Sequence, residues 1–161
     1  MRNEKLKSRE QMRLISGEMK KAGKKLVFTN GCFDLIHGGH IEILKKAKKL
    51  GDALLVAVNS DPSVKKIKPA GRPILPEKER LEVLAALVYV DYLVLFDDPD
   101  PLELIRTIQP AILVKGGDWA KDDIIGGREV TEAGGEVRTI PYLEGHSTTE
   151  IINRILEHHK K

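Results

Sequence analysis

Two histidines separated by two glycines are the most chemically suggestive feature of the sequence. His37 and His40 stand in the segment NGCFDLIHGGH, which passes from an apolar run into a helical pattern. A spacing of three residues places both imidazoles on one face of the first helical turn. The glycines let a phosphate approach the backbone closely, and the free N–H groups of a helix start attract anions. The segment therefore predicts a site that binds phosphate groups with two imidazoles.

Paired imidazoles beside a nucleoside triphosphate suit phosphoryl-type transfer. Such transfer needs mainly positioning and stabilisation of charge on the α-phosphate and the departing pyrophosphate, so no protein nucleophile is required. The GxxxxGK[ST] and GxGxxG loops are absent from this turn. Zinc binding by the two histidines is the alternative, but further Cys or His ligands at a suitable spacing are missing. Cys32 is interpreted as a small buried thiol at a strand end.

Two later segments also carry groups that suit an anionic nucleotide. Ser147 and Glu150 have the spacing of a capping box, and the hydroxyl-rich helix start between them can also hold phosphates. Residues 115–119, KGGDW, supply a cation, two glycines, a carboxylate and the only tryptophan, Trp119. A plain turn with a solvated lysine is the alternative for this segment, and Trp119 could either cover a site or seal the core.

The elements that must position these groups alternate between strand-like and helix-like patterns. The run 53–59 is apolar throughout, as is typical of a strand buried on both faces. The expected strands are 25–30, 53–59, 92–96, 111–114 and 136–140. The expected helices are 8–21, 39–50, one from about 76 with a buried stripe of Leu81, Leu84, Ala85 and Val88, and then 101–108, 122–133 and 147–158. Residues 60–75 are expected to form a polar loop.

Helices that connect apolar strands imply right-handed crossovers and a parallel sheet covered on both faces. The sequence thus predicts an α/β fold: a single Rossmann-like, doubly wound domain with about five parallel strands. Ligands in such sheets bind beyond the carboxyl ends of the strands. Segments 30–40, 115–119 and 144–149 all fall at such ends, so we expect them to form one site.

Composition indicates a compact globular protein of 161 residues, with 41% hydrophobic and 32% charged residues. We expect one domain over 1–161, with a helical lead-in at 1–24 and a catalytic core at 25–158. The net charge of +3 does not suggest a nucleic-acid binder. The apolar runs are too short to span a bilayer, the N-terminus does not resemble a signal peptide, and a single cysteine allows no internal disulfide. These features predict a cytoplasmic protein.

The pattern GxFDxxHxGH resembles the signature of the cytidylyltransferase-like nucleotidyltransferase superfamily. The longer form NGCFDLIHGGH, followed in order by VKGGDW, GGEVRTIP and EGHSTTEII, is similar to its heptose 1-phosphate adenylyltransferase branch. The resemblance extends over about residues 26–156. It implies transfer of AMP from ATP, with Mg²⁺, onto D-glycero-β-D-manno-heptose 1-phosphate, giving ADP-heptose for the lipopolysaccharide core. It also suggests a homodimer, with the sugar kinase as a separate protein.

The resemblance implies roles for individual residues. The expected catalytic residues are His37, His40 and Lys68. The expected nucleotide-binding residues are Gly31, Cys32, Phe33, Gly39, Lys115, Gly116, Asp118, Ser147, Thr148 and Thr149. The expected substrate-binding residues are Asp34, Asn59, Lys66 and Arg72. Lys66 is also the alternative to Lys68 as the catalytic lysine, and Asp34 is alternatively a residue that pins its loop. Arg80 is expected to help through the loop that carries Lys68. No resident metal ligand is expected.

Two other functions remain open at this stage. Composition and spacing do not separate adenine from cytosine, so a cytidylyltransferase acting on glycerol 3-phosphate or a similar ester is the alternative enzyme. Relatives that transfer cytidylyl groups often carry Arg-Thr before the third segment, whereas this chain has Pro141 and Tyr142. The usual arginine contact is therefore unassigned. A nucleotide-binding module without turnover is the alternative outside the enzyme class.

Overall fold

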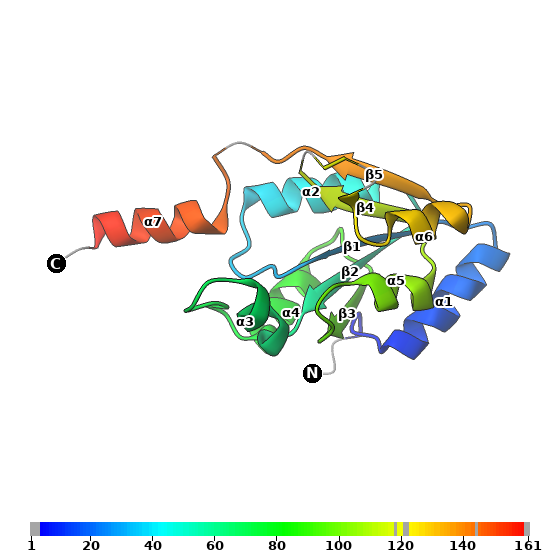
Figure 1. Ribbon diagram of the computed structural model, residues 1–161, viewed down its shortest axis with the longest axis horizontal. Coiled ribbons are helices and arrows are strands. Elements are labelled where there is room, and N and C mark those ends of the chain that lie inside the picture. Colours follow the sequence, from blue (N-terminus) through cyan, green and yellow to red (C-terminus); the bar gives the residue numbers. More distant parts are fainter. Residues whose placement is uncertain (1–3, 118, 121–122, 144, 160–161) are drawn as a thin grey trace.

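Five parallel strands form the centre of the structure, a computed structural model that describes residues 4–117, 119–120, 123–143 and 145–159 (Figure 1). The strands are β1 Leu26–Gly31, β2 Ala53–Asn59, β3 Tyr92–Phe96, β4 Ile112–Gly116 and β5 Glu136–Ile140. They form one sheet in the order β3-β2-β1-β4-β5, and every pairing is parallel. The predicted doubly wound α/β fold is therefore confirmed. The order reverses between β1 and β4, so the site predicted from the sequence falls at the switch point.

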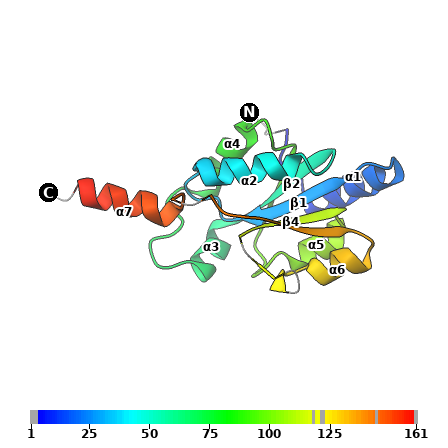
Figure 2. The same cartoon turned by 90° about the horizontal axis from the view of Figure 1, so that it is seen from above.

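Helices cover both faces of this sheet. The helices of the structure are α1 Arg9–Lys21, α2 Gly38–Lys48, α3 Asp61–Ile67, α4 Glu77–Ala86, α5 Leu102–Ile108, α6 Gly127–Glu132 and α7 Thr148–His158. Figure 2 shows α2 and α4 on one face of the sheet and α5 and α6 on the other. Alternate residues of β2 serve the two layers, because Leu54 packs in the cluster of Leu44 and Leu84 while Leu55 packs in that of Met12 and Ile105. This explains the uninterrupted apolar run 53–59.

The segment 60–75 is not wholly a loop, and that expectation was wrong. Its first half is α3, and Ser60 is the N-cap residue of this helix. The Ser60 side-chain oxygen accepts a hydrogen bond from the Ser63 N–H at 3.2 Å. Proline in the first turn and the buried Val64 complete a short helix. The helix was not predicted because the segment is mostly polar and only Ser63 and Val64 of α3 are buried.

Helix α4 also differs from the prediction. It ends at Ala86, so Val88 lies beyond it and is 81% exposed instead of buried. Arg80 takes a place on the buried face and is 0% exposed. Helix α6 is shorter than the expected 122–133, and Gly126, with a φ of 83°, precedes its first residue. A residue in the left-handed region interrupts a right-handed helix, so α6 cannot extend to residues before Gly127.

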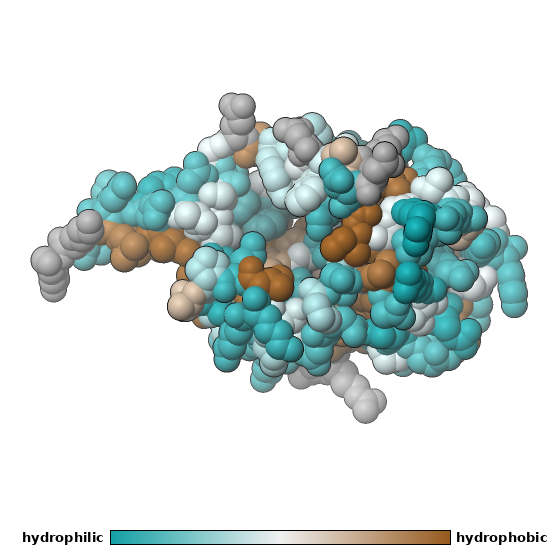
Figure 3. Space-filling view, in the orientation of Figure 1, coloured by the Kyte–Doolittle hydropathy of each residue, from teal (hydrophilic) through white to brown (hydrophobic). Residues whose placement is uncertain are grey.

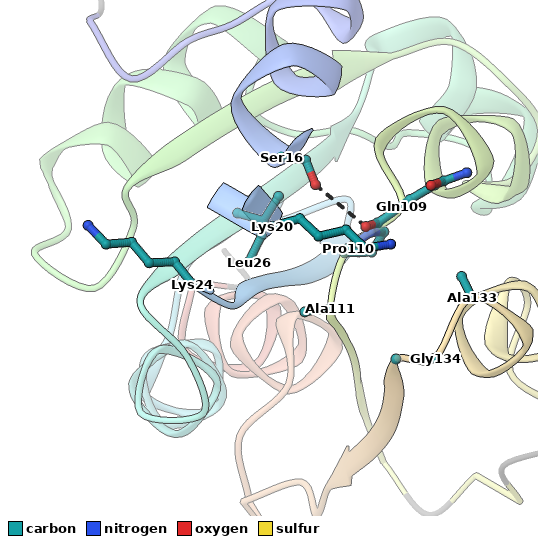
Figure 4. A pocket seen from close by; sticks show the side chains of 10 residues that line it. Ser16, Lys20, Lys24, Leu26, Gln109, Pro110, Ala111, Ala133 and Gly134 are labelled. Atoms are coloured by element: carbon teal, nitrogen blue, oxygen red, sulfur yellow. Dashed lines mark hydrogen bonds between the residues drawn. The ribbon is translucent and has the colours of Figure 1, made fainter. Parts of the chain in front are cut away.

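The N-terminal helix α1 packs on the core through one face. Met12 is fully buried, and Ile15 and Met19 pack on the same cluster. Beside α1, a shallow hollow opens at the amino ends of the strands, where the Ser16 hydroxyl lies 3.5 Å from the Gln109 carbonyl oxygen (Figure 4). This hollow lies at the opposite end of the sheet from the predicted site.

The C-terminal helix α7 projects away from the body of the molecule (Figures 1 and 2). It contains no buried residue, and an apolar stripe runs along it (Figure 3). Ile155 and Leu156 are the exposed large residues of this stripe. Among the described residues, no helix has the length and hydropathy needed to cross a membrane.

Candidate active site

Three loops meet at the carboxyl edge of the sheet, as the motifs predicted. The Gly117 N–H, after β4, donates to the Ile140 carbonyl at the end of β5 at 2.8 Å. The Thr148 hydroxyl, at the start of α7, donates to the Leu35 carbonyl in the turn after β1 at 3.4 Å. The switch-point topology thus places the three motif segments around one site.

The two histidines of the first segment are held as a pair at the start of α2. His37 is the N-cap residue, and the His40 N–H donates to the His37 carbonyl at 2.9 Å. Their ring centroids lie 3.9 Å apart with the planes tilted by 35°, and the Phe33 ring lies 5.3 Å from that of His40. Phe33 has a φ of 48°, so the backbone reverses sharply between the strand and the helix. The imidazoles therefore lie next to the free N–H groups of α2.

Both imidazoles are neutral near pH 7. Burial lowers the pKa of His40 to about 4, with a further contribution from His37. Burial also lowers the pKa of His37, helped by the nearby His146 and opposed by Glu150. The Nδ1 atoms of His37 and His40 are buried and have no hydrogen-bond partner among the described residues. An arriving phosphate would thus meet neutral imidazoles at the start of α2.

The glycines of the turn are surrounded by imidazoles. A Cβ atom on Gly39 would lie 3.0 Å from Cε1 and Nδ1 of His37 and 3.2 Å from Cβ of His146. A Cβ atom on Gly38 would lie 3.2 Å from Cδ2 of His146. Sequence reasoning assigned His146 no role, although it lies directly before the hydroxyl-rich helix start. The structure adds it as a third imidazole at this turn.

Lysines supply the positive charge of the site. Lys115, at the end of β4, is half-buried, and burial lowers its pKa, with Cys32 opposing and Lys68 adding to the effect. Lys68 follows α3 and is exposed. The two lysines and the Cys32 thiol thus belong to one electrostatic group. Lys66 lies two residues earlier in the chain, on α3, and is also exposed.

Cys32 is half-buried, which departs from the buried thiol expected at this strand end. Burial raises the pKa of its thiol, although Lys68, Arg80 and Arg72 act in the opposite direction. A raised pKa keeps the group a neutral thiol at pH 7, which argues against a nucleophile. Its Sγ lies 4.0 Å from Oδ1 of Asn59, the last residue of β2. The amide nitrogen of Asn59 donates to the Ser63 hydroxyl at 3.0 Å, so that side chain is held in place.

Asp34 is 2% exposed and joins the first turn to the loop after α3. Its carboxylate accepts hydrogen bonds from the Ile74 N–H at 2.8 Å, the Leu75 N–H at 3.0 Å and the Arg72 guanidinium. Burial works to raise its pKa, but these donors outweigh burial, so the pKa lies below its usual range. The contacts favour the pinning role of Asp34 over direct substrate contact, and they occupy Arg72 as well.

The remaining predicted residues lie around the same edge. The Ser147 hydroxyl accepts from the Glu150 N–H at 3.1 Å, as its capping spacing predicted, and Thr149 is exposed beside it. Trp119 is 48% exposed, so it does not seal the core. Its indole N–H donates to the Gly116 carbonyl at 3.1 Å, and the Lys115 ammonium lies 6.0 Å from its ring centroid. Asp118 lies outside the described residues.

Comparison with known sequences gives matches over most of the chain. A family model described as cytidylyltransferase-like matches residues 28–154. The bifunctional protein HldE of Syntrophotalea carbinolica is 46% identical over 157 residues, which are 98% of this chain and 32% of that protein. HldE of Citrifermentans bemidjiense is 53% identical over 135 residues, 83% of this chain and 28% of that protein. The chain therefore spans about a third of the length of these relatives.

Solved structures give a consistent fold. The lipopolysaccharide core biosynthesis protein of Thermoplasma volcanium superposes with a TM-score of 0.63 at 28% identity, covering 77% of this chain and all of that one. A pantoate-β-alanine ligase of Francisella tularensis, solved in complex with β-γ ATP and β-alanine, gives a TM-score of 0.61 at 17% identity, covering 94% of this chain and 77% of that one. The ligase likeness shows a shared fold.

Proposed function

Because the chain belongs to the cytidylyltransferase-like family, we propose that it is a nucleotidyltransferase that moves AMP from ATP onto a sugar 1-phosphate. The proposed acceptor is D-glycero-β-D-manno-heptose 1-phosphate, and the products are ADP-heptose and pyrophosphate. The observation that carries the proposal is the pair of neutral imidazoles, 3.9 Å apart, at the start of α2. The start of α7 lies beside this pair and adds hydroxyl groups and free N–H groups.

The reaction needs positioning more than covalent chemistry. An oxygen of the sugar phosphate attacks the α-phosphorus in line, and the bond from that phosphorus to the β-bridging oxygen breaks to release pyrophosphate. His37 and His40 donate hydrogen bonds to the α-phosphate and the leaving group, where negative charge grows. Ser147, Thr148 and Thr149 hold the β- and γ-phosphates. Lys68 and Lys115 offset the repulsion between the two anions.

The choice of ATP and heptose 1-phosphate is supported by two likenesses. The relatives that match at 46% and 53% identity are bifunctional HldE proteins, and the T. volcanium protein is described as a lipopolysaccharide core biosynthesis protein. Since this chain spans about a third of the HldE relatives, the proposal covers the nucleotidyl transfer step alone. It places that step in the supply of activated heptose for lipopolysaccharide.

Mg²⁺ enters the proposal as a companion of ATP. Among the described residues, no three carboxylate, imidazole or thiol groups gather closely enough to cage a metal ion. Asp34, which lies in the same turn as the two histidines, is occupied by three donors of its own chain. Magnesium often binds mainly through substrate phosphates and water, so a site with few free carboxylates can still accept it together with ATP. It would supply positive charge to the phosphate oxygens.

Location and assembly complete the proposal. An ATP-dependent enzyme with a free thiol at its site is suited to the cytoplasm. We further propose a homodimer, which is the state suggested by the superfamily resemblance. Sedimentation equilibrium of the purified chain measures the oligomeric state, and a single species of 18.0 kDa would contradict the dimer.

A pyrophosphate-release assay tests the proposed reaction directly. ATP and CTP are each combined with heptose 1-phosphate and with glycerol 3-phosphate, and release is measured in all four mixtures. The proposal expects turnover with ATP and heptose 1-phosphate at least about tenfold above the other three, a difference of 1.4 kcal/mol in transition-state binding. Turnover with CTP and glycerol 3-phosphate would replace it with the alternative enzyme. ATP binding without pyrophosphate release would indicate a sensor.

A further inference from the structure

A fully buried arginine lies directly behind the proposed site. Arg80, on the first turn of α4, is 0% exposed, and its ion-pair partner Asp61 is only partly exposed. Burying a guanidinium is unfavourable, and an apolar residue of similar volume often gives a more stable protein. Core packing alone therefore does not explain an arginine at this position. The contacts of its guanidinium do.

The guanidinium joins three separate segments of the site. Its Nη1 donates to the carbonyl of Cys32, in the turn that leads to the two histidines. Its Nη2 donates to Oδ1 of Asp61, the first residue of α3, at 2.8 Å. Its Nε donates to the carbonyl of Leu75, at the end of the loop after α3, at 3.1 Å. All three types of nitrogen in the fork are used.

These contacts hold both ends of the segment that carries Lys68. Asp61 begins this segment and Leu75 ends it, and a second bond, from the Asp61 N–H to Oε2 of Glu77 at 2.8 Å, fixes its start to α4. The contact to Cys32 ties the same side chain to the histidine turn. Arg80 thereby sets the distance between the lysine segment and the histidine turn.

We propose that Arg80 is a positioning residue for nucleotidyl transfer, which holds the Lys68 segment in register with the turn of His37 and His40. This inference rests on the proposed function. Three donors in one rigid plane are needed, and lysine, with a single ammonium on a flexible stem, reproduces the charge without the geometry. The structure thus assigns Arg80 to the geometry of the site, because its side chain is fully buried and its nitrogens donate to groups of the protein itself.

The test compares Arg80→Lys with Leu84→Ala, one turn later on α4. Leu84 is also fully buried in a core cluster, but its apolar side chain makes no hydrogen bond to the loops, so its variant controls for lost stability. Urea unfolding, ATP affinity by calorimetry, and kcat and KM for the acceptor are measured for both. We expect Arg80→Lys to lower kcat by roughly 100-fold, as misplacement of about 1 Å can, with KM for the acceptor raised and ATP affinity within about threefold. Leu84→Ala should keep kcat within about threefold while it is folded.

Unchanged kcat in Arg80→Lys, or equal losses of kcat in both variants, would overturn the inference. If Arg80→Lys does not fold, Asp61→Ala carries the test, because Asp61 is partly exposed and its removal frees the start of α3. That variant should lose about tenfold in kcat, and no loss would equally overturn the inference. A wild-type chain that turns over another acceptor would contradict the proposed substrate instead, and the Arg80 comparison is then made with that acceptor.

Discussion

Asp34 and Ile74, separated by 39 residues in the chain, are joined by a hydrogen bond of 2.8 Å from the Ile74 N–H to the Asp34 carboxylate. This bond and the neighbouring one from Leu75 connect the histidine turn to the loop that follows α3. Two loops that would otherwise move separately are therefore one structural unit. The geometry of the proposed site depends on this connection as well as on the sheet.

Asp34→Asn should weaken both stability and transfer. The amide keeps the volume but loses the charge and places an NH₂ group against backbone donors, so the free energy of unfolding should fall by about 1–3 kcal/mol. Asp98→Asn is the matched control, because Asp98 pairs with Arg9 at the surface, where such pairs contribute about 0–1 kcal/mol. Urea unfolding measures both variants. Equal changes in the two would show that Asp34 does not connect the loops.

His40→Asn should reduce kcat by about 100-fold or more while the protein remains folded. The change removes a hydrogen-bonding imidazole next to the proposed position of the α-phosphate, where a single lost donor commonly costs this much. His158→Asn, near the exposed end of α7, should leave kcat unchanged. Pyrophosphate release and circular dichroism are measured together. Near wild-type turnover in His40→Asn would remove the histidine pair from the mechanism.

The partly buried imidazole of His40 should make stability depend on pH below neutrality. Its pKa is about 4 in the folded chain against an ordinary value of 6.5. Above pH 6.5 the group is neutral in both states; as the pH falls, the unfolded chain takes up the proton first and unfolding is favoured. Between pH 7 and pH 5 the wild type should lose on the order of 2 kcal/mol more than His40→Asn. An equal loss of unfolding free energy in the wild type and in His40→Asn would contradict the lowered pKa of His40.

Gly39→Ala should impair the site because the added methyl group would crowd the His37 ring. The added carbon would lie 3.0 Å from the His37 ring, so the ring must move. We expect weaker ATP binding and lower kcat, with folding retained. Gly17→Ala provides the control, since nothing lies within 4 Å of that position, and it should stabilise α1 by about 0.5–1 kcal/mol. Unchanged ATP affinity in Gly39→Ala would show that the turn tolerates the displacement.

Trp119 offers a direct signal for nucleotide binding. It is the only tryptophan, and its half-exposed indole donates to the carbonyl of Gly116 beside Lys115. ATP should therefore change its fluorescence with a saturating dependence on concentration. The same titration of His40→Asn should report the loss of affinity independently of turnover. A signal that does not respond to ATP would place Trp119 outside the nucleotide site.

Periodicity predicted the fold well because the sheet is buried on both faces. The apolar run of β2 and the glycine and proline boundaries identify parallel strands without any knowledge of contacts. Parallel strands in turn bring distant motifs to one edge, so the histidine turn and the start of α7 could be assigned to one site. Helix α3 was missed because it has only seven residues, most of them polar.

Contacts between distant residues could not be predicted in the same way. Arg80 is a charged residue, so a search for apolar residues at helical spacing does not assign it to the core. The partners of its guanidinium lie at positions 32, 61 and 75. Nothing in the spacing of these residues relates them. His146, which follows β5, likewise lies beside Gly38 and Gly39, which follow β1. The two segments come together because β4 lies between β1 and β5 in the sheet and all three strands are parallel. Such relationships arise from tertiary structure and require coordinates.

The separation of α7 from the core bears on the order in which the molecule is completed. The fifth strand ends at Ile140, and no residue of α7 is buried, so both hydrophobic clusters are complete before that helix is reached. A ribosome that has released residues up to 140 has supplied every buried apolar side chain that the structure describes. Ser147, Thr148 and Thr149 emerge later. The chain can therefore reach its folded shape during synthesis before it acquires the groups proposed to hold the triphosphate.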